Sequence, residues 1–588
     1  MVQRLVEGGR ASEHPRGRRH YRSGFPARAS HERTGRRAVK AVYERGAGQP
    51  FASRSEAFST RGMVATSQVF ATQAGLDILR SGGNAVDAAI AANAVLGLTE
   101  PTGCGIGGDL FAMVWEPDKD APVGLNASGR APRSLNLDVF RNLSLDSIPS
   151  LGPLPVSTPG AVDGWFELHG RYGSLDFGKL LAPAIELARE GFPVGQLTAS
   201  AWARNARSLH EFPGFADCYM PGGDAPAKGQ VFANPRLAQT YETLAADGRE
   251  AFYRGEIAWK IAAYMRENGG YLDESDLASH ASEWVKPVSS SYRGNDVYAL
   301  PPNTQGIATL QILNLLEQHD IRPLGFVSAK YLHLLIEAKK LAFEDRARYY
   351  ADPAFVATPT EELISKEYAL ERGRLIDPER AATAVVHGDP RLDSPQTVYL
   401  AAGDRDGLLI SLIQSNYRGM GSGMTPGDLG FVLHNRGELF NLDPDHPNAL
   451  VPGKRPFHTI IPGLARFAGG ERLAFGVMGG SMQPQAQAQV IANVVDFDMD
   501  LQAAGDAPRV FHSGSSQPTG ELAQEDGGRL ALEPGFGEAV RKELTGMGHV
   551  MGRARGVFGG YQAVMHDARS GVLTGASDPR KDGQAAGL

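Results

Sequence analysis

The chain has 588 residues, 42% of them hydrophobic, with 71 glycines, 37 prolines and a formal net charge of −7. This length and composition favour a soluble enzyme built as one large layered domain or as two to four smaller ones, and they exclude a disordered chain. No run of 18 apolar residues is present, so no membrane span is expected.

The N-terminal segment 1–48 is basic and contrasts with the rest of the chain. Residues 1–45 hold twelve Lys or Arg and four Glu, a balance of +8, so the remainder carries about −15. An acidic body argues against nucleic acid as the main partner. Neither apolar periodicity nor interleaved aromatic residues accompany the basic charge. A disordered extension is therefore favoured over a nucleic-acid arm or a targeting peptide.

Two features indicate the cellular location. No apolar stretch follows the N-terminal arginines, so a secretory signal peptide is not expected. The two cysteines, Cys104 and Cys218, are too few for a disulfide framework or a four-cysteine zinc site, and they fit a reducing compartment. The sequence therefore predicts a cytoplasmic protein.

The first predicted elements are a strand, two helices and a second strand. Residues 62–67 have the pattern of a short strand, and residues 70–80 form an amphipathic stretch that ends at a Ser-Gly-Gly turn. Asn84 can cap a second, alanine-rich helix, whose apolar residues on every side predict burial. The loop 100–108 contains Gly-x-Gly-x-x-Gly, but a helix precedes it and the predicted strand 110–115 follows it. The dinucleotide-binding fingerprint needs the opposite order, so no nucleotide binding is expected.

The middle of the chain is mostly helical by pattern from residue 159 to 268. Its predicted elements, in order, are amphipathic helices at 177–189 and 234–246, a helical turn at 271–284, strands within 288–300, and helices at 307–317 and 329–349. Residues 351–396 have weak periodicity and many Pro, Asp, Arg and Ser residues. This composition predicts an exposed linker and a proteolysis site.

The pattern after this linker changes to β. Residues 397–402 and 408–414 read as two strands of a hairpin around an Asp-Gly turn. The remaining predicted elements are short strands at 431–433, 458–462 and 473–478, and a helix at 485–495.

The chemistry is indicated first by what is missing, because the chain has no His-Glu-x-x-His, Walker or Gly-x-Ser-x-Gly motif. We therefore predict neither a metal nor a cofactor, and attention moves to the linker-to-strand boundary before Thr397. An N-terminal threonine can act alone, with its hydroxyl as nucleophile and its α-amine, of pKa roughly 7.7–8.0, as general base. A cut before Thr397 would create that amine. The residues alone do not separate this interpretation from a threonine that merely begins a strand.

A set of collinear segments from about residue 50 to the C-terminus resembles the γ-glutamyltranspeptidase family, in its simpler bacterial branch of transpeptidase-like amide hydrolases. The matching segments are GMVATS at 62–67, GGNAVDAAIAANAVLGLTEP at 82–101, GIGGDLF at 105–111, PGAVDGW at 159–165, LLAPAIELAREGFPV at 180–194, LPPNTQGIATLQ at 300–311, TVYLAAGDRDG at 397–407, SLIQSN at 411–416, GKRPFHTIIP at 453–462 and GVMGGSMQPQAQ at 476–487.

The resemblance implies an α+β fold, the four-layer αββα sandwich of N-terminal-nucleophile hydrolases. It implies a precursor cut into a large subunit, 49–396, and a small subunit, 397–588, with a dimer of these processed pairs as a further option. Thr397 would attack the peptide bond during maturation and later the amide of a small-molecule substrate.

The resemblance also implies roles for three other residues. Ser415 would hydrogen-bond Thr397, and the N–H groups of Gly479 and Gly480 would form the oxyanion hole. The alternatives are an ordinary strand hydroxyl for Ser415 and a simple tight turn for the glycine pair.

The substrate-binding residues depart from the family pattern. His458 and Thr459 occupy the place of two substrate-holding serines, or form only a wall. Arg130 is displaced towards Ala-Pro and can clamp a carboxylate or make a structural ion pair. Tyr417 and Leu439 stand where the family has an asparagine and an acidic residue.

These departures leave three predicted functions open. The first is hydrolysis or transfer of γ-glutamyl or related short acidic acyl groups. The second is hydrolysis of oxamate or of the glutaryl amide of a cephalosporin. The third is a catalytically silent binding protein. Efficient recognition of glutathione is not expected, because a missing ionic partner for a buried amine costs several kcal/mol.

Overall fold

The first helices show how local sequence signals determine the elements of the fold. In the computed structural model, which describes residues 51–383, 397–553 and 556–588, α1 spans Val69–Arg80 and α2 spans Ala85–Thr99. The Asn84 side chain accepts hydrogen bonds from the N–H groups of Val86 and Asp87, and the Asp87 carboxylate accepts one from the Asn84 N–H. This reciprocal cap starts α2, and every residue of α2 is buried, as predicted.

Seven antiparallel strands form a first sheet, in the order β18-β2-β10-β11-β3-β4-β7. Its hairpin is β10–β11, as predicted, and the Asp404 carboxylate accepts hydrogen bonds from the N–H groups of Asp406 and Leu408 in the turn. The strands are β2 (Gly62–Thr66), β3 (Asp109–Trp115), β4 (Val123–Ala127), β7 (Glu283–Val285), β10 (Val398–Asp404), β11 (Leu409–Ser415) and β18 (Gln584–Gly587).

A second sheet also has seven antiparallel strands, in the order β1-β17-β16-β13-β12-β9-β8. The predicted strands at 288–300 and 473–478 both belong to it. Its strands are β1 (Ala57–Ser59), β8 (Val288–Tyr292), β9 (Asn295–Ala299), β12 (Gly463–Arg466), β13 (Arg472–Val477), β16 (Tyr561–Asp567) and β17 (Val572–Ser577).

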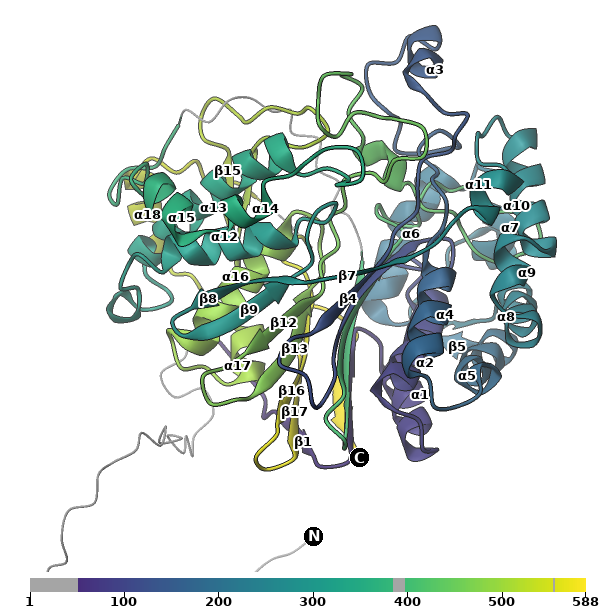
Figure 1. Cartoon of the computed structure of the whole chain (residues 1–588), viewed down its shortest axis with the longest axis horizontal. Helices are drawn as coiled ribbons and strands as arrows, with labels where there is room; N and C mark the ends of the chain where they lie inside the picture. Colours follow the sequence, from purple (N-terminus) through teal and green to yellow (C-terminus); the bar gives the residue numbers. More distant parts are fainter. Residues whose placement is uncertain (1–50, 384–396, 554–555) are drawn as a thin grey trace, which may run out of the picture. The chain divides into compact units, whose positions relative to one another are not determined.

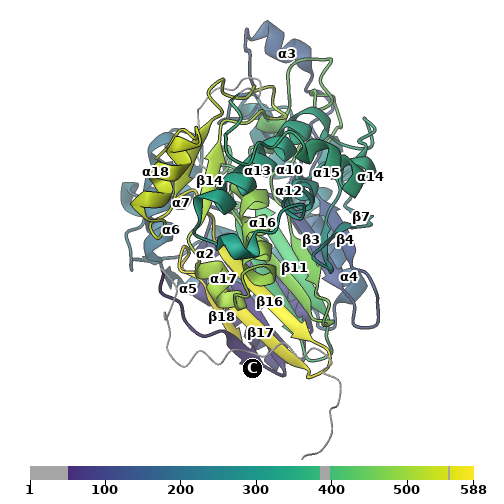
Figure 2. The same ribbon diagram turned by 90° about the vertical axis from the view of Figure 1, so that its left-hand side faces the viewer.

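The two sheets face one another and helices cover their outer faces (Figure 1). Because successive side chains of a strand point to opposite faces, Met63 and Ala65 of β2 join Val564 and Leu573 in an apolar cluster between the sheets, whereas Val64 packs towards the helices. The helices on the first sheet are α1, α2, α4 (Ala161–Tyr172) and α5 (Phe177–Glu190), and those on the second are α12 (Gly306–Leu316), α13 (Ala329–Tyr349), α16 (Met482–Val495) and α17 (Leu501–Asp506). Figure 2 shows α17 over β16 and β17. The prediction of a mixed α+β fold is confirmed.

The predicted helical segment 159–268 is also confirmed. Beyond α4 and α5 it contains α6 (Gln196–Leu209), α7 (Phe215–Tyr219), α8 (Pro235–Asp247), α9 (Arg249–Tyr253) and α10 (Glu256–Glu267). The other short elements are α3 (Leu137–Asn142), α11 (Glu274–Ala278), α14 (Thr360–Leu363), α15 (Lys366–Gly373), α18 (Glu538–Gly546), β5 (Phe192–Pro193), β6 (Val231–Phe232), β14 (Val510–Ser513), β15 (Arg529–Leu532) and the 3-10 helices η1 (Pro221–Gly223), η2 (Arg322–Leu324) and η3 (Arg436–Leu439).

Three local predictions are wrong. Residues 351–383 are not a structureless linker, because they contain α14 and α15; the rest of the predicted linker, 384–396, and the predicted extension 1–48 lie outside the described residues. Residues 431–433 and 458–462 are not strands. Their N–H groups bind separate neighbours instead, as Leu433 does with the Met424 carbonyl and His458 with the Asn303 carbonyl.

No helix among the described residues has the length and apolar character needed to cross a membrane.

Candidate active site

Thr397 lies immediately before β10 and is buried. The pairing of Val398 with Gln414 puts Thr397 opposite Ser415, at the end of β11. The Thr397 hydroxyl donates a hydrogen bond to the Ser415 hydroxyl at 3.2 Å between Oγ1 and Oγ. Gly103 packs closely against the backbone of Thr397, since a Cβ on Gly103 would lie 3.3 Å from the Thr397 carbonyl. The structure therefore brings Thr397 and Ser415 together, as the sequence predicts.

Tyr417 connects Ser415 to the residues beyond the strand. Its N–H donates a hydrogen bond of 2.8 Å to Ser415 Oγ. Tyr417 has φ of 75°, in the left-handed region that costs a non-glycine residue about 1–3 kcal/mol. Its ring is almost fully buried. The turn thus holds the Ser415 hydroxyl from one side while Thr397 contacts it from the other.

Gly479 and Gly480 form a left-handed turn before α16, with φ of 122° and 56°. Gly476, three residues earlier, packs directly on the Tyr399 ring, which places the turn near the start of β10. Neither glycine N–H donates a hydrogen bond to another residue in the described parts of the chain. Gln305 Nε2 donates to the carbonyls of Gly480 and Thr459, at 2.8 and 2.6 Å, and so joins the turn to Thr459.

Asp109 is a buried carboxylate that sequence reasoning missed. It is paired with Ser415 in the ladder between β3 and β11. Its carboxylate accepts hydrogen bonds from His458 Nε2 at 2.8 Å and from the Gly129 N–H at 2.9 Å. Burial opposes its ionisation, but nearby His434 and the hydrogen bond from His458 outweigh burial and hold its pKa well below the ordinary value. Asp109 is therefore a fixed negative charge opposite Ser415, at the end of β11.

His458, the partner of Asp109, is a neutral, buried histidine at physiological pH. Burial and then the charge of Arg436 lower its pKa to about 3, although Asp109 favours protonation. Its Nδ1 has no hydrogen-bond partner within the described residues. Its ring packs edge-on against Phe111, with centroids 4.8 Å apart.

The low pKa of His458 predicts a loss of stability in mild acid. The unfolded chain takes up the proton at about pH 6.5 but the folded chain only near pH 3, so unfolding is coupled to proton uptake between these values. The free energy of unfolding should therefore fall as the pH drops below about 6.5, by on the order of 1–2 kcal/mol before pH 5. Thermal unfolding midpoints at several pH values measure this loss.

His458→Asn should shrink the acid-induced drop in the unfolding midpoint, because the substituted side chain does not titrate. His210→Asn, which makes the same substitution at an exposed position, is the matched control. An equal drop in the wild type and His458→Asn would contradict the assignment.

Arg130 makes ion pairs in the structure. Its guanidinium lies 2.7 Å from a Glu283 oxygen and 3.5 Å from an Asp352 oxygen. It lines a polar cavity of about 250 Å³ together with Thr158 and His280. Neither these ion pairs nor the hydrogen bond from Arg130 to the Gly453 carbonyl reaches Thr397, and they match the ion pair that is one of the two predicted roles of Arg130.

Arg436 is a second residue that sequence reasoning did not single out. It begins η3, is fully buried, and donates a hydrogen bond from Nη1 to Thr459 Oγ1 at 2.9 Å. Its guanidinium carbon lies 4.5 Å from the centre of the Tyr417 ring. Burial lowers its pKa to about 10, so it remains charged at neutral pH. The only sequence signal is an arginine directly after the buried stretch 431–435.

One group in the described part of the chain has the residue types of a metal site. His333, Glu337 and His549 are buried, with their ligand atoms within 4.8 Å of one another. These atoms already bind protein groups: His333 Nδ1 and His549 Nε2 lie 2.9 Å apart, and Lys340 donates to Glu337 at 2.8 Å. The group is thus a satisfied polar cluster in the helical layer.

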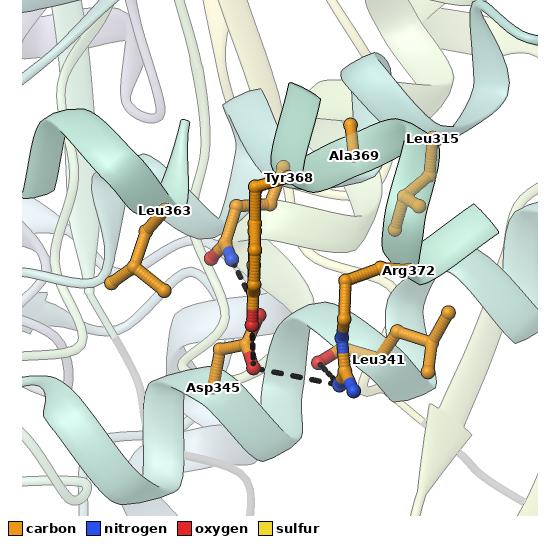
Figure 3. Close-up of a pocket in the computed structure, with 8 residues that line it drawn as sticks. Leu315, Leu341, Asp345, Leu363, Tyr368, Ala369 and Arg372 are labelled. Atoms are coloured by element: carbon orange, nitrogen blue, oxygen red, sulfur yellow. Dashed lines mark hydrogen bonds and ion pairs between the residues drawn. The ribbon is translucent and has the colours of Figure 1, made fainter. Parts of the chain in front are cut away.

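A small pocket between α12, α13 and α15 lies in the same helical layer (Figure 3). Asp345 points into it and accepts hydrogen bonds from Tyr368 at 3.0 Å and from Gln311 at 2.8 Å, with Arg372 at 3.4 Å. The sequence did not predict α15. Its polar residues Tyr368 and Arg372 anchor this helix to Asp345 of α13. None of the predicted site residues lines the pocket.

Comparisons with known proteins show which proteins this chain resembles. The gamma-glutamyltranspeptidase family model matches residues 71–588. The chain is 36% identical to the glutathione hydrolase-like YwrD proenzyme of Bacillus subtilis strain 168, over 90% of this chain and 99% of that protein. It is 35% identical to the acylase ACY 1 proenzyme of Pseudomonas sp. strain SE83, over 90% and 94%. The structure of cephalosporin acylase from Bacillus halodurans superposes with a TM-score of 0.83 at 40% identity, over 91% and 97%.

Proposed function

Because this chain belongs to the gamma-glutamyltranspeptidase family of hydrolases and acyltransferases, we propose that it is a self-processing amide hydrolase whose nucleophile is Thr397. The observation that carries this proposal is the contact between the Thr397 and Ser415 hydroxyls at the start of β10. The names of the relatives support processing, since both are proenzymes.

A cut before Thr397 frees its α-amine, which then takes the proton of the Thr397 hydroxyl. The hydroxyl oxygen attacks the substrate carbonyl, and the N–H groups of Gly479 and Gly480 stabilise the developing oxyanion. The protonated amine returns its proton to the leaving amine as the C–N bond breaks. Water, or an acceptor amine, then attacks the Thr397 ester and releases the acyl group. Ser415 orients the nucleophile throughout.

The cut would give a large subunit that ends at residue 396 and a small subunit that starts at Thr397. β10 and β11 of the small subunit lie between β2 and β3 of the large subunit in one sheet. The two subunits therefore remain interleaved after the cut. We infer that the paired sheets with their outer helices are the four-layer αββα sandwich of N-terminal-nucleophile hydrolases.

The acyl-enzyme step gives a direct test. Protein quenched during turnover of a slowly hydrolysed acyl anilide should yield a small fragment whose N-terminal residue is Thr397 and carries the mass of the acyl group. Below about pH 8, kcat/KM should rise with pH, because the free amine acts as the base. A small fragment that starts elsewhere, or an adduct on another residue, would refute the proposal.

A further inference from the structure

Arg436 is a buried cation with no carboxylate partner within ion-pair distance among the described residues. Nη1 binds Thr459 Oγ1, but Nε and Nη2 have no hydrogen-bond partner in the described parts of the chain. The adjacent acid, Glu438, instead binds Arg418 and Ser150, each at 2.8 Å. The other nearby anion, Asp109, is occupied by His458 and the Gly129 N–H.

This arrangement is costly unless an anion completes it. A buried charge that lacks a partner costs several kcal/mol, and an unsatisfied buried donor adds to that cost. Arg436 is nevertheless held in place, with the Tyr417 ring over its face and Thr459 fixing one nitrogen. The two remaining nitrogens match the planar, two-oxygen geometry of a carboxylate.

Two sets of contacts link Arg436 to the reacting groups. Tyr417, which packs on the guanidinium, donates its N–H to Ser415 Oγ, the partner of Thr397. Thr459, which binds Nη1, shares Gln305 with the Gly480 carbonyl in the proposed oxyanion turn. Two residues therefore connect Arg436 to the nucleophile, and two connect it to the oxyanion turn.

A second buried arginine belongs to the same hydrogen-bond network, through Gln305. Arg346 of α13 donates to Gln305 Oε1 at 2.7 Å and to Gln517, while its Nε has no partner among the described residues. Its guanidinium carbon lies 3.8 Å from the centre of the Phe343 ring. Two buried guanidinium groups on the same glutamine network favour an anion and oppose an ammonium group.

We propose that Arg436 binds the terminal carboxylate of the acyl group, so that the enzyme prefers carboxyacyl amides without an α-amine, such as glutaryl amides, over γ-glutamyl amides. This inference rests on the proposed function and names its substrate class. The α-ammonium of a γ-glutamyl group would be repelled by Arg436 and Arg346, whereas the glutaryl group keeps the chain length and carries only the carboxylate.

Three p-nitroanilides test this preference: glutaryl, γ-glutamyl and the uncharged butyryl. For the processed wild type, kcat/KM on the glutaryl anilide should exceed that on either of the others by about 10- to 100-fold, the value of a charge-assisted hydrogen bond. Arg436→Gln should lower glutaryl turnover by a similar factor and butyryl turnover by a much smaller one, because the butyryl group has no carboxylate to lose a partner. Arg436→Lys should recover part of the lost glutaryl turnover, because lysine keeps the positive charge but cannot make two parallel hydrogen bonds to a carboxylate.

Arg322→Gln is the matched control, since it removes an exposed guanidinium paired with Asp498 and should alter none of the three rates. A wild type that is cut at Thr397 but hydrolyses γ-glutamyl or butyryl anilide as fast as the glutaryl anilide overturns the inference and leaves the proposed function standing. Equal losses on the glutaryl and butyryl anilides in a cut Arg436→Gln protein also overturn it. A wild type that stays uncut, or is cut and hydrolyses none of the three, refutes the proposed function and the inference together.

Discussion

Thr397→Ala is expected to leave the chain as one uncut polypeptide of 62.8 kDa without amidase activity. The substitution removes the Oγ1 that contacts Ser415 and that would attack both the peptide bond and the substrate. No other described hydroxyl makes the same contact with Ser415 Oγ, so activity should fall by at least about 10⁴-fold, as when other covalent nucleophiles are removed. Denaturing gels and anilide hydrolysis measure the two effects.

Thr397→Ser keeps the hydroxyl and is the matched control. It should still cut itself and retain measurable activity, with a change in rate set by the loss of the methyl group. Ser415→Ala keeps the nucleophile but removes its partner, and should slow both reactions without abolishing them. If Thr397→Ala were still cut at the same bond, the role of Thr397 in maturation would be wrong.

The parts of the fold that the sequence predicted depend on short-range signals. Asn84 and Asp87 lie three residues apart and cap α2 by themselves. The β10–β11 hairpin follows from an Asp-Gly turn between two apolar runs. Such elements need no knowledge of distant contacts, and each was found within a few residues of its predicted bounds.

The parts that could not be predicted depend on distant contacts. Residues 431–433 look like a strand, but the stretch is fixed by single hydrogen bonds, such as the one from Leu433 to Met424, and never joins a sheet. Asp109 acquires its role only because β3 lies beside β11 and brings it opposite Ser415, 306 residues later. Arg436 looks like a surface charge in the sequence. Only its burial, with no carboxylate partner among residues that the structure describes, distinguishes it from the many arginines that pair at the surface.

Asp578→Asn is expected to lower the free energy of unfolding strongly, because it removes the charge of a buried ion pair. Asp578 and Arg509 are both buried, and Asp578 Oδ2 lies 2.7 Å from Arg509 Nη2. The same oxygen accepts a hydrogen bond from the Tyr561 N–H at 2.9 Å. Removing the charge leaves Arg509 buried with no full counter-ion, which typically costs about 3–5 kcal/mol. The cost should appear as a lower midpoint in urea-induced unfolding.

The uncut Thr397→Ala chain is the right background for this measurement, because unfolding then remains unimolecular. Asp526→Asn removes an exposed carboxylate from an ion pair with Arg529 and should cost less than about 1 kcal/mol. The double variant Asp578→Leu with Arg509→Met tests the mechanism further. If the loss of stability arises from an unpaired buried charge, replacing both partners should recover most of the lost free energy of unfolding. If the double variant is as unstable as Asp578→Asn, the loss comes from the other contacts of Asp578, with the Tyr561 N–H and with Arg580, or from packing.

The Asp578 network is also connected to Thr397, through the segment that follows Asp578. Lys581 pairs with Glu100 at 2.9 Å, and the Glu100 carbonyl accepts a hydrogen bond from the Gly103 N–H at 2.9 Å. Gly103 packs against the Thr397 carbonyl. Loosening the segment at Asp578 should therefore slow the cut before Thr397 when Asp578→Asn is placed in the wild-type chain, whereas Asp526→Asn should not. If folded Asp578→Asn is cut at the normal rate, the ion pair between Asp578 and Arg509 contributes to stability but not to the cut before Thr397.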